Sequence, residues 1–330
     1  MYDVITFGSS TRDVFVKIKE GGFRVVEEKD FVTGKGICYP LGSKVEVEEL
    51  FFSPGGGGVN SAVTFARQGF NTAAVGVLAN DIGGNEILKF LKDEGVETKM
   101  FLKSEGGLGT AYSLVLFSSS GERTILTYKG EGKNFDENKI KWDEVEAKWF
   151  YVDSLGGNLN LLEKIIETAK EKGVRIAMNP GGKTLEHGLD ALRPYLDSID
   201  ILALNKEEAA RLTGIDYENE KEIFKFMDEI VKGIFIMTKG PEGAVVSDGE
   251  KIYRVGAINR EAVERTGAGD SFNSGFVAGY IQSDGDIEEA LKLAMVNAEN
   301  VVSYIGATKG ILKKGDIGSG PLPEVVTEKL

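Results

Sequence analysis

From residue 148 onward, short apolar runs alternate with longer segments of helical spacing, and this alternation constrains the fold more than any other feature. The predicted strands lie at 148–152, 174–179, 201–204 and 234–238. The predicted helices lie at 159–172, 189–196, 207–213, 268–282 and 287–304. Parallel strands need crossovers of this kind, because a tight turn cannot join them. We therefore expect an α/β sandwich, in which helices cover both faces of a mostly parallel sheet.

Two parts of the first half, 11–52 and 108–128, have the alternating pattern of strands with one exposed face. In the second part, the runs 110–117 and 124–128 are joined by 118–122, which is typical of a hairpin. We expect these parts to form a small, separate antiparallel sheet, a lid. No repeat or linker-like stretch divides the chain, so residues 1–330 are expected to form a single domain.

The charge of the chain excludes several classes of function. Its 39 Lys and Arg residues and 52 Asp and Glu residues leave a formal charge of −13, which disfavours nucleic-acid binding. No polybasic stretch would hold it on an anionic membrane, and no apolar run approaches the ~18 residues of a membrane span. With one cysteine and one histidine, it has neither a disulfide framework nor a histidine-rich metal site. The N-terminus lacks the pattern of a signal peptide, so we expect a cytoplasmic protein.

The strongest local signal is Gly267-Ala268-Gly269-Asp270, directly before a predicted helix. Unobstructed N–H groups at a helix N-terminus, together with the helix dipole, form an anion site. A carboxylate beside bound phosphate makes sense if Asp270 accepts a proton from an attacking hydroxyl while the amides hold the transferred group. A first-turn carboxylate that merely favours the dipole would have the same spacing, so both interpretations stay open.

A second glycine run, 55–58, leads into the helix predicted at 61–68 and is followed by Asn60. The chain holds 43 glycines in 330 residues, roughly 13% against a usual ~7%, which indicates turns and close backbone approaches. The run lets backbone groups approach a polar ligand, and Asn60 adds an amide. A hinge with Asn60 as helix N-cap explains the same residues. The third glycine of a dinucleotide fingerprint is missing.

Polar residues at strand ends are the weaker signals. Asn205 and Glu208 follow one predicted strand, and Thr238 and Gly240 follow the next. Ligands of open parallel sheets bind at this edge, and an amide with a carboxylate suits a hydrated Mg²⁺. A solvated first helical turn is the alternative for Glu208. Asp13, taken alone, is an ordinary turn aspartate.

The segment 177–184 nearly matches a phosphate-binding Walker A loop, with Ala177 in place of the first glycine. Ala177 lies inside an apolar strand, and the residues after Thr184 start a helix poorly. We interpret this segment as a strand-end loop.

Together these residues resemble the ribokinase family of carbohydrate kinases, the PfkB type. The two anchors are the glycine run with Asn60 and the segment 266–272, and the resemblance spans nearly the whole chain. Asn205, Glu208 and the pair Gly306-Ala307 agree in order and spacing.

This resemblance implies an α/β/α sandwich with a β-sheet lid that transfers the γ-phosphoryl group of ATP to a sugar hydroxyl. Asp270 would be the catalytic base, beside an anion hole of Gly267, Ala268 and Gly269. The acceptor would be held by Asp13, Gly56, Gly57, Gly58 and Asn60. Asn205 and Glu208 would organise phosphate and Mg²⁺, and the nucleotide would also contact Thr238, Gly240 and the region of Asn297. Positioning and charge neutralisation are what phosphoryl transfer requires.

Several positions depart from the family pattern. Glu264 stands where many members have an aspartate of a monovalent-cation site, which argues against activation by such a cation. Gly57 replaces a lysine and Thr11 an asparagine, so the acceptor is expected to be a sugar or nucleoside rather than ribose specifically. Arg123, in the lid hairpin, either reaches phosphate or is solvated.

Two other functions fit the resemblance. A nucleoside kinase would need lid aromatics such as Tyr112 or Phe117 to stack a base, and a sugar-binding relative would lack catalysis. Family lids often pair, so a homodimer through the lid is expected by analogy.

Overall fold

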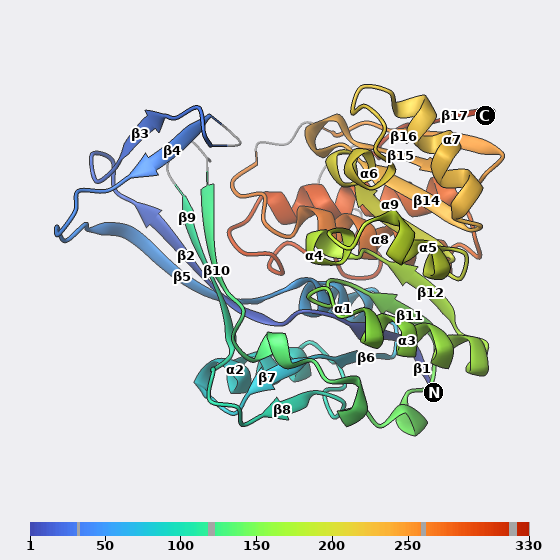
Figure 1. The fold of residues 1–330 in the computed structure, drawn as a ribbon, viewed down its shortest axis with the longest axis horizontal. Helices are drawn as coiled ribbons and strands as arrows, with labels where there is room; N and C mark the ends of the chain where they lie inside the picture. Colours follow the sequence, from blue (N-terminus) through green and yellow to red (C-terminus); the bar gives the residue numbers. More distant parts are fainter. Residues whose placement is uncertain (32–33, 118–122, 259–261, 317–321, 330) are drawn as a thin grey trace.

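A computed structural model describes residues 1–31, 34–117, 123–258, 262–316 and 322–329. Its main sheet has the strand order β17-β16-β15-β14-β13-β12-β11-β1-β6 (Figure 1). The strands are β1 Tyr2–Phe7, β6 Thr72–Val75, β11 Ala147–Val152, β12 Arg175–Met178, β13 Ile201–Asn205, β14 Ile234–Thr238, β15 Ala244–Ser247, β16 Lys251–Val255 and β17 Val325–Lys329. Neighbours from β6 to β14 are parallel, and those from β14 to β17 are antiparallel.

Helices cover both faces of this sheet, which confirms the predicted sandwich. The helices are α1 Gly57–Arg67, α2 Ile82–Asp93, α3 Leu159–Lys172, α4 Gly181–Leu185, α5 Leu189–Leu196, α6 Lys206–Thr213, α7 Glu220–Ile230, α8 Ala268–Gln282 and α9 Ile287–Val302. Alternate residues of β11 show the two faces. Phe150 and Val152 join the apolar core under α3, α5, α6 and α7, and Trp149 and Tyr151 join the core under α1, α8 and α9.

The lid is a four-stranded sheet that projects from one side of the body in Figure 1. Its strands, in the order β10-β9-β2-β5, are β2 Thr11–Ile18, β5 Val47–Gly55, β9 Ala111–Phe117 and β10 Arg123–Tyr128. The expectation of a wholly antiparallel lid was wrong, because β2 pairs parallel with β9. The chain passes through α1, β6 and α2 of the body between these two strands, so both enter the lid from the same end. The predicted turn 118–122 lies outside the described residues.

Two small sheets and short helical turns complete the described structure. Antiparallel β3 Arg24–Glu27 and β4 Lys35–Cys38 lie at the outer end of the lid (Figure 1). The predicted strand at 72–78 is broken at Gly76 into β6 and β7 Val77–Ala79, which pairs with β8 Leu102–Ser104. Single helical turns lie at η1 Gly130–Asn134, η2 Glu137–Lys139, η3 Trp142–Glu144 and η4 Gly240–Glu242.

Helix α1 starts inside the glycine run, four residues earlier than expected. Gly56, with φ of 90°, occupies the N-cap, so Asn60 lies within the helix and does not cap it. The N–H of Gly58 donates to the carbonyl of Ser9 at 3.1 Å, and a Cβ on Gly58 would lie 2.8 Å from the carbonyl carbon of Gly8. The absence of side chains thus lets the helix begin directly against the end of β1.

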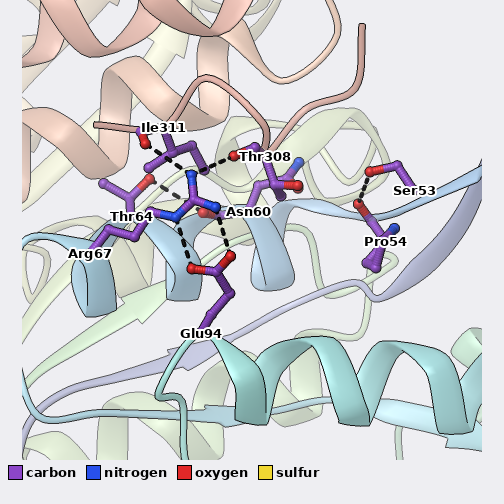
Figure 2. A network of polar contacts seen from close by, with 8 residues as sticks. All are labelled: Ser53, Pro54, Asn60, Thr64, Arg67, Glu94, Thr308 and Ile311. Atoms are coloured by element: carbon purple, nitrogen blue, oxygen red, sulfur yellow. Dashed lines mark hydrogen bonds and ion pairs between the residues drawn. The ribbon is translucent and has the colours of Figure 1, made fainter. Parts of the chain in front are cut away.

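Arg67, at the C-terminal end of α1, joins three parts of the chain (Figure 2). Its guanidinium donates two hydrogen bonds to the carboxylate of Glu94, at 2.8 and 2.6 Å. It also donates to the carbonyls of Thr308 at 2.8 Å and Ile311 at 2.9 Å. Both side chains of the ion pair are more than four-fifths buried. Arg67 therefore holds the segment after α9 in place, and this segment contains Ala307, which contacts the candidate site.

Replacing Arg67 by methionine should lower the free energy of unfolding by ~2–4 kcal/mol, because a largely buried carboxylate and two carbonyls lose their donor. Lys89→Met is the matched control, since Lys89 pairs with Asp93 in an exposed i,i+4 contact that contributes less than ~0.5 kcal/mol. Urea unfolding of both variants measures the difference. Equal, small losses would show that the Arg67 network carries little of the stability.

Candidate active site

Two cavities meet at the N-terminus of α8. The first, which we call the lid cavity, has a volume of about 290 Å³ and lies between the lid and the body. Asp13, Gly56, Asn60, Thr266 and Asp270 are among its lining residues. The second, the sheet-end cavity, has a volume of about 500 Å³ and is lined in part by Asn205, Thr238, Gly240, Arg123, Ala268 and Gly269. The turn from Thr266 to Asp270 therefore borders both cavities.

This turn needs glycine for a packing reason. Gly267 has φ of 80° and is the N-cap of α8, and a Cβ at this position would lie 2.5 Å from the Cβ of Ala307. The N–H of Ala268 donates to the carbonyl of Arg265 at 3.3 Å, and that of Ser271 donates to the carbonyl of Gly267 at 2.9 Å. The helix dipole and the remaining first-turn N–H groups favour an anion here.

The carboxylate of Asp270 is held by one neutral donor. Nδ2 of Asn60 donates to Oδ2 of Asp270 at 2.7 Å, across 210 residues of sequence. Burial raises the pKa of Asp270, and this hydrogen bond opposes the rise. Because an ionised carboxylate only accepts, the bond also fixes the orientation of the Asn60 amide. Its buried Oδ1 has no hydrogen-bond partner among the described residues.

Asp153 is a functional candidate that the sequence interpretation missed. It follows β11 directly, is buried, and accepts a hydrogen bond from the N–H of Ser154 at 2.6 Å. Burial and the nearby charge of Asp270 raise its pKa well above the ordinary range. Its position at the carboxyl end of a parallel strand, the criterion applied to Asn205 and Thr238, could have identified it.

Asp13 lies on β2 at the base of the lid. Its Oδ1 accepts a hydrogen bond from the Thr11 hydroxyl at 2.7 Å. Burial raises the pKa of Asp13 to about 6, and the charges of Asp270 and Glu264 add to the rise. A Cβ on Gly55 would lie 1.9 Å from its Oδ2, so the first glycine of the run makes space for this carboxylate.

Asn205 and Glu208 form a capping box at the start of α6. The N–H of Glu208 donates to Oδ1 of Asn205 at 2.8 Å, and the N–H of Asn205 donates to Oε2 of Glu208 at 3.0 Å. The two side chains therefore cap α6, whether or not they also bind a ligand. The sequence analysis did not identify this capping box. Burial raises the pKa of Glu208.

Arg123 connects the lid to the turn that precedes α8. Its Nε lies 3.6 Å from Oε1 of Glu264, whose side chain is only 2% exposed. The same Oε1 accepts hydrogen bonds from the N–H and the hydroxyl of Thr266, at 2.8 and 2.6 Å. Arg123 is thus an ion-paired residue rather than a fully solvated one.

Comparison with known proteins supplies the family. The sequence pattern of the pfkB family carbohydrate kinases matches residues 31–314. The chain belongs to this family. An uncharacterized sugar kinase of Archaeoglobus fulgidus is 29% identical over 259 residues, which cover 76% of this chain and 99% of the relative. The ribokinase of Haemophilus influenzae is 27% identical over 263 residues, covering 78% of this chain and 83% of the relative.

The fold is also that of this family. The structure of Arabidopsis thaliana ribokinase complexed with ribose and ATP has a TM-score of 0.77 with this chain, at 24% identity, and the match covers 96% of this chain and 97% of the other. The present chain is therefore a kinase of the ribokinase fold. As a pfkB family member it is a phosphotransferase that acts on the hydroxyl group of a sugar or nucleoside.

Five of the predicted site residues of this carbohydrate kinase lie outside both cavity linings: Gly57, Gly58, Glu208, Gly267 and Asn297. Asn297 is buried in α9, where its side chain donates to the carbonyl of Ser271 at 2.8 Å and accepts from the N–H of Leu312 at 2.9 Å. Gly57 and Gly58 are buried, and a Cβ on Gly57 would lie 1.8 Å from Oδ1 of Asp153. Asn297 therefore ties α8 to the segment after α9 by hydrogen bonds, and Gly57 and Gly58 allow close packing beside the site.

The Walker-like segment of the kinase has a different structure from the expected loop. Gly181–Leu185 form the short helix α4, and Lys183 pairs with Glu186 at 2.8 Å on the surface. Lys183 lines neither the lid cavity nor the sheet-end cavity.

The acidic residues that the structure describes do not form a metal cage. In the part of the chain that the structure describes, no group of three or more His, Cys, Asp or Glu side chains is arranged to hold a metal ion. Glu208 and Asn205 fit a Mg²⁺ that takes most of its ligands from phosphate oxygens and water.

No helix within the described ranges has both the length and the apolar character needed to cross a membrane.

The raised pKa of Asp13 predicts a pH-dependent stability. The ordinary pKa is 3.8 and the folded value is about 6, so folded Asp13 resists the ionisation that the unfolded chain undergoes as the pH rises. As the pH rises from about 4 to about 6, the free energy of unfolding therefore falls, because the unfolded chain ionises this carboxyl more readily than the folded chain does. The free energy of unfolding of Asp13→Asn, minus that of the unmodified chain, should therefore rise by roughly 1 kcal/mol from pH 5 to pH 8.

Urea unfolding at both pH values measures this gain, with the exposed Asp143→Asn as the control. A parallel pH dependence for Asp13→Asn and the unmodified chain would contradict the assigned burial of the charge.

Proposed function

We propose that the protein is a sugar kinase that transfers the γ-phosphoryl group of ATP to a hydroxyl of its acceptor. The acceptor occupies the lid cavity and the nucleotide occupies the sheet-end cavity. One observation carries this proposal: the two cavities meet at a helix N-terminus that also bears a buried carboxylate. Donor phosphate and acceptor hydroxyl would therefore come together at the same turn.

Asp270 acts as the catalytic base. It accepts the proton of the acceptor hydroxyl, the oxygen of that hydroxyl forms a bond to the γ-phosphorus, and the bond to the bridging oxygen breaks to release ADP. A buried carboxylate with a raised pKa suits this role. The N–H groups of Gly267, Ala268 and Gly269 hold the oxygens of the migrating phosphoryl group, with Ala268 exchanging its bond to Arg265 for one to phosphate.

The acceptor is held by groups that the lid cavity presents. Asp13 accepts hydrogen bonds from hydroxyl groups, Oδ1 of Asn60 accepts another, and Gly56 offers its backbone. The buried hydroxyl of Ser10, which has no partner among the described residues, also lines this cavity.

We favour a sugar over a nucleoside as the acceptor in this cavity, because the two lid aromatics named for stacking a base have other contacts. Tyr112 does not line it, because its hydroxyl accepts a hydrogen bond from Arg12 on the other face of the lid. Phe117 is buried in an apolar cluster with Phe15 and Val115. The aromatic residues proposed to stack a base are therefore committed elsewhere.

The nucleotide contacts Asn205, Thr238 and Gly240, which line the sheet-end cavity. Mg²⁺ would neutralise its phosphates near Glu208, the capping-box partner of Asn205. When bound, the metal ion supplies positive charge to the transferring group. Arg123 supplies a further positive charge from the lid. Because Arg123 already balances Glu264, we propose that the kinase needs no monovalent cation at this place.

The outer face of the lid is apolar, and we propose that it pairs with a second copy of the chain. Phe52, Val14, Leu114 and Leu126 lie in register across the four strands. Phe52 and Leu126 are each 54% exposed. A contiguous apolar face of this kind is typical of an interface.

Light scattering of the purified chain should give the mass of a dimer, and the Phe52→Glu, Leu126→Glu double variant should give that of a monomer with unchanged circular dichroism. A monomeric unmodified chain would refute the pairing and leave the kinase reaction unaffected.

Asp270→Asn should lower kcat by at least ~100-fold, because the amide cannot accept the proton, while Asn60 still finds an acceptor oxygen and the fold persists. ADP release is measured with Mg²⁺-ATP against a panel of sugars and nucleosides, and thermal unfolding checks the fold. Asp93→Asn, an exposed carboxylate on α2, is the control. Unchanged turnover of Asp270→Asn would reject the assigned base. A nucleoside as preferred acceptor would replace the sugar.

A further inference from the structure

The face of the lid that borders the lid cavity is built from alternate residues of three strands. Asp13 on β2 lies opposite Ser113 on β9, and Ser113 lies opposite Thr127 on β10. All three line the cavity. Ile125, Thr127 and Lys129 follow one another at intervals of two, so Lys129 continues the cavity-facing series just beyond the end of β10.

Among the described residues that line the lid cavity, Lys129 is the one cation. Its amino group has no ion pair or hydrogen bond with any residue in the described ranges. The acidic residue nearest in sequence, Glu131, does not neutralise it. The buried carboxylate of Glu131 accepts hydrogen bonds from Ser104 at 2.6 Å, from the N–H of Leu108 at 2.9 Å and from Asn134 at 2.6 Å. Lys129 is therefore a charge in the cavity wall without a structural partner.

The other charged groups of this wall are carboxylates. Asp13 and Asp270 would repel an anionic acceptor, and the chain as a whole is acidic. A neutral sugar needs only hydroxyl, amide and carboxylate groups, which the cavity already contains. An ammonium group in such a wall has a binding role if the acceptor carries negative charge of its own.

We propose that the acceptor carries an anionic substituent, a carboxylate or a phosphate, and that Lys129 binds it. The inference deepens the proposed function and rests on it only in assigning the lid cavity to the acceptor. Arg123 and Lys129 stand at opposite ends of β10, separated by about 20 Å along an extended strand. Arg123 borders the sheet-end cavity, so the anionic substituent lies toward the base of the lid, away from the donor nucleotide.

The test compares three arms of acceptors: neutral sugars such as fructose and ribose, sugar acids such as gluconate, and sugar phosphates such as fructose 6-phosphate. The kcat/KM for ADP release should be highest with either the sugar acids or the sugar phosphates. The group with the higher value identifies the substituent as a carboxylate or a phosphate. Lys129→Met should raise KM for that acceptor at least ~30-fold with little change in kcat. Lys129→Arg should restore most of the loss, because the guanidinium keeps the charge.

Lys133→Met is the matched control, since Lys133 is an exposed lysine of η1 that lines neither cavity. It should behave as the unmodified kinase does. A neutral sugar as best acceptor, with unchanged kinetics in Lys129→Met, would overturn the inference and leave the kinase function in place.

A binding measurement separates failure of the inference from failure of the function. Calorimetry with gluconate and with fructose 6-phosphate should show that the Asp270→Asn variant binds one of these anions. Adding Lys129→Met to that variant should weaken the binding. Such binding without ADP release from any acceptor in the unmodified chain would support the anion site and refute the kinase function. Anion binding that is equal in Lys129→Met and Lys133→Met would refute the anion site.

Discussion

The hydrogen bond from Asn60 to Asp270 is the contact on which the candidate site depends. It joins α1 to α8 and holds one carboxylate oxygen of Asp270, and in the proposed mechanism the other oxygen would accept the proton of the acceptor hydroxyl. The donor is a neutral amide, and this matters for the chemistry. A lysine or arginine in its place would lower the pKa of Asp270 and weaken it as a base, whereas the amide orients the carboxylate and preserves part of the rise that burial produces.

The site brings several carboxylates together in an already acidic protein, and the structure limits their mutual repulsion in different ways. Burial and the charge of Asp270 raise the pKa of Asp153 well above its ordinary value, and burial also raises the pKa of Asp270, where the hydrogen bond from Asn60 opposes the rise. Arg123 balances Glu264, and the N-terminus of α8 supplies the field that an incoming phosphate needs. Under the proposed function, the positive field for phosphate would thus come from the backbone dipoles of α8 and from Arg123 of the lid.

The elements with local signals could be predicted from the sequence. Helices α5 and α8 and strand β14 have the expected bounds, because hydrophobic spacing and flanking glycines define them within a few residues. Contacts between distant segments defined the rest. The parallel pairing of β2 with β9 depends on the route of the intervening chain, and the early start of α1 depends on the end of β1. Strand β17 and helix α7 were not anticipated.

The glycine run shows why its sequence alone left two interpretations open. Each position is small for a different reason: Gly55 faces Asp13, Gly56 faces Ser9, Gly57 faces Asp153 and Gly58 faces Gly8. The glycines of the run are therefore required by the carboxylates of Asp13 and Asp153 and by the end of β1, as well as by any ligand. A side chain at position 57 and a carboxylate at position 153 would compete for one volume. Gly57 and Asp153 are in this sense a single structural feature, because the missing side chain at position 57 makes room for the buried acid.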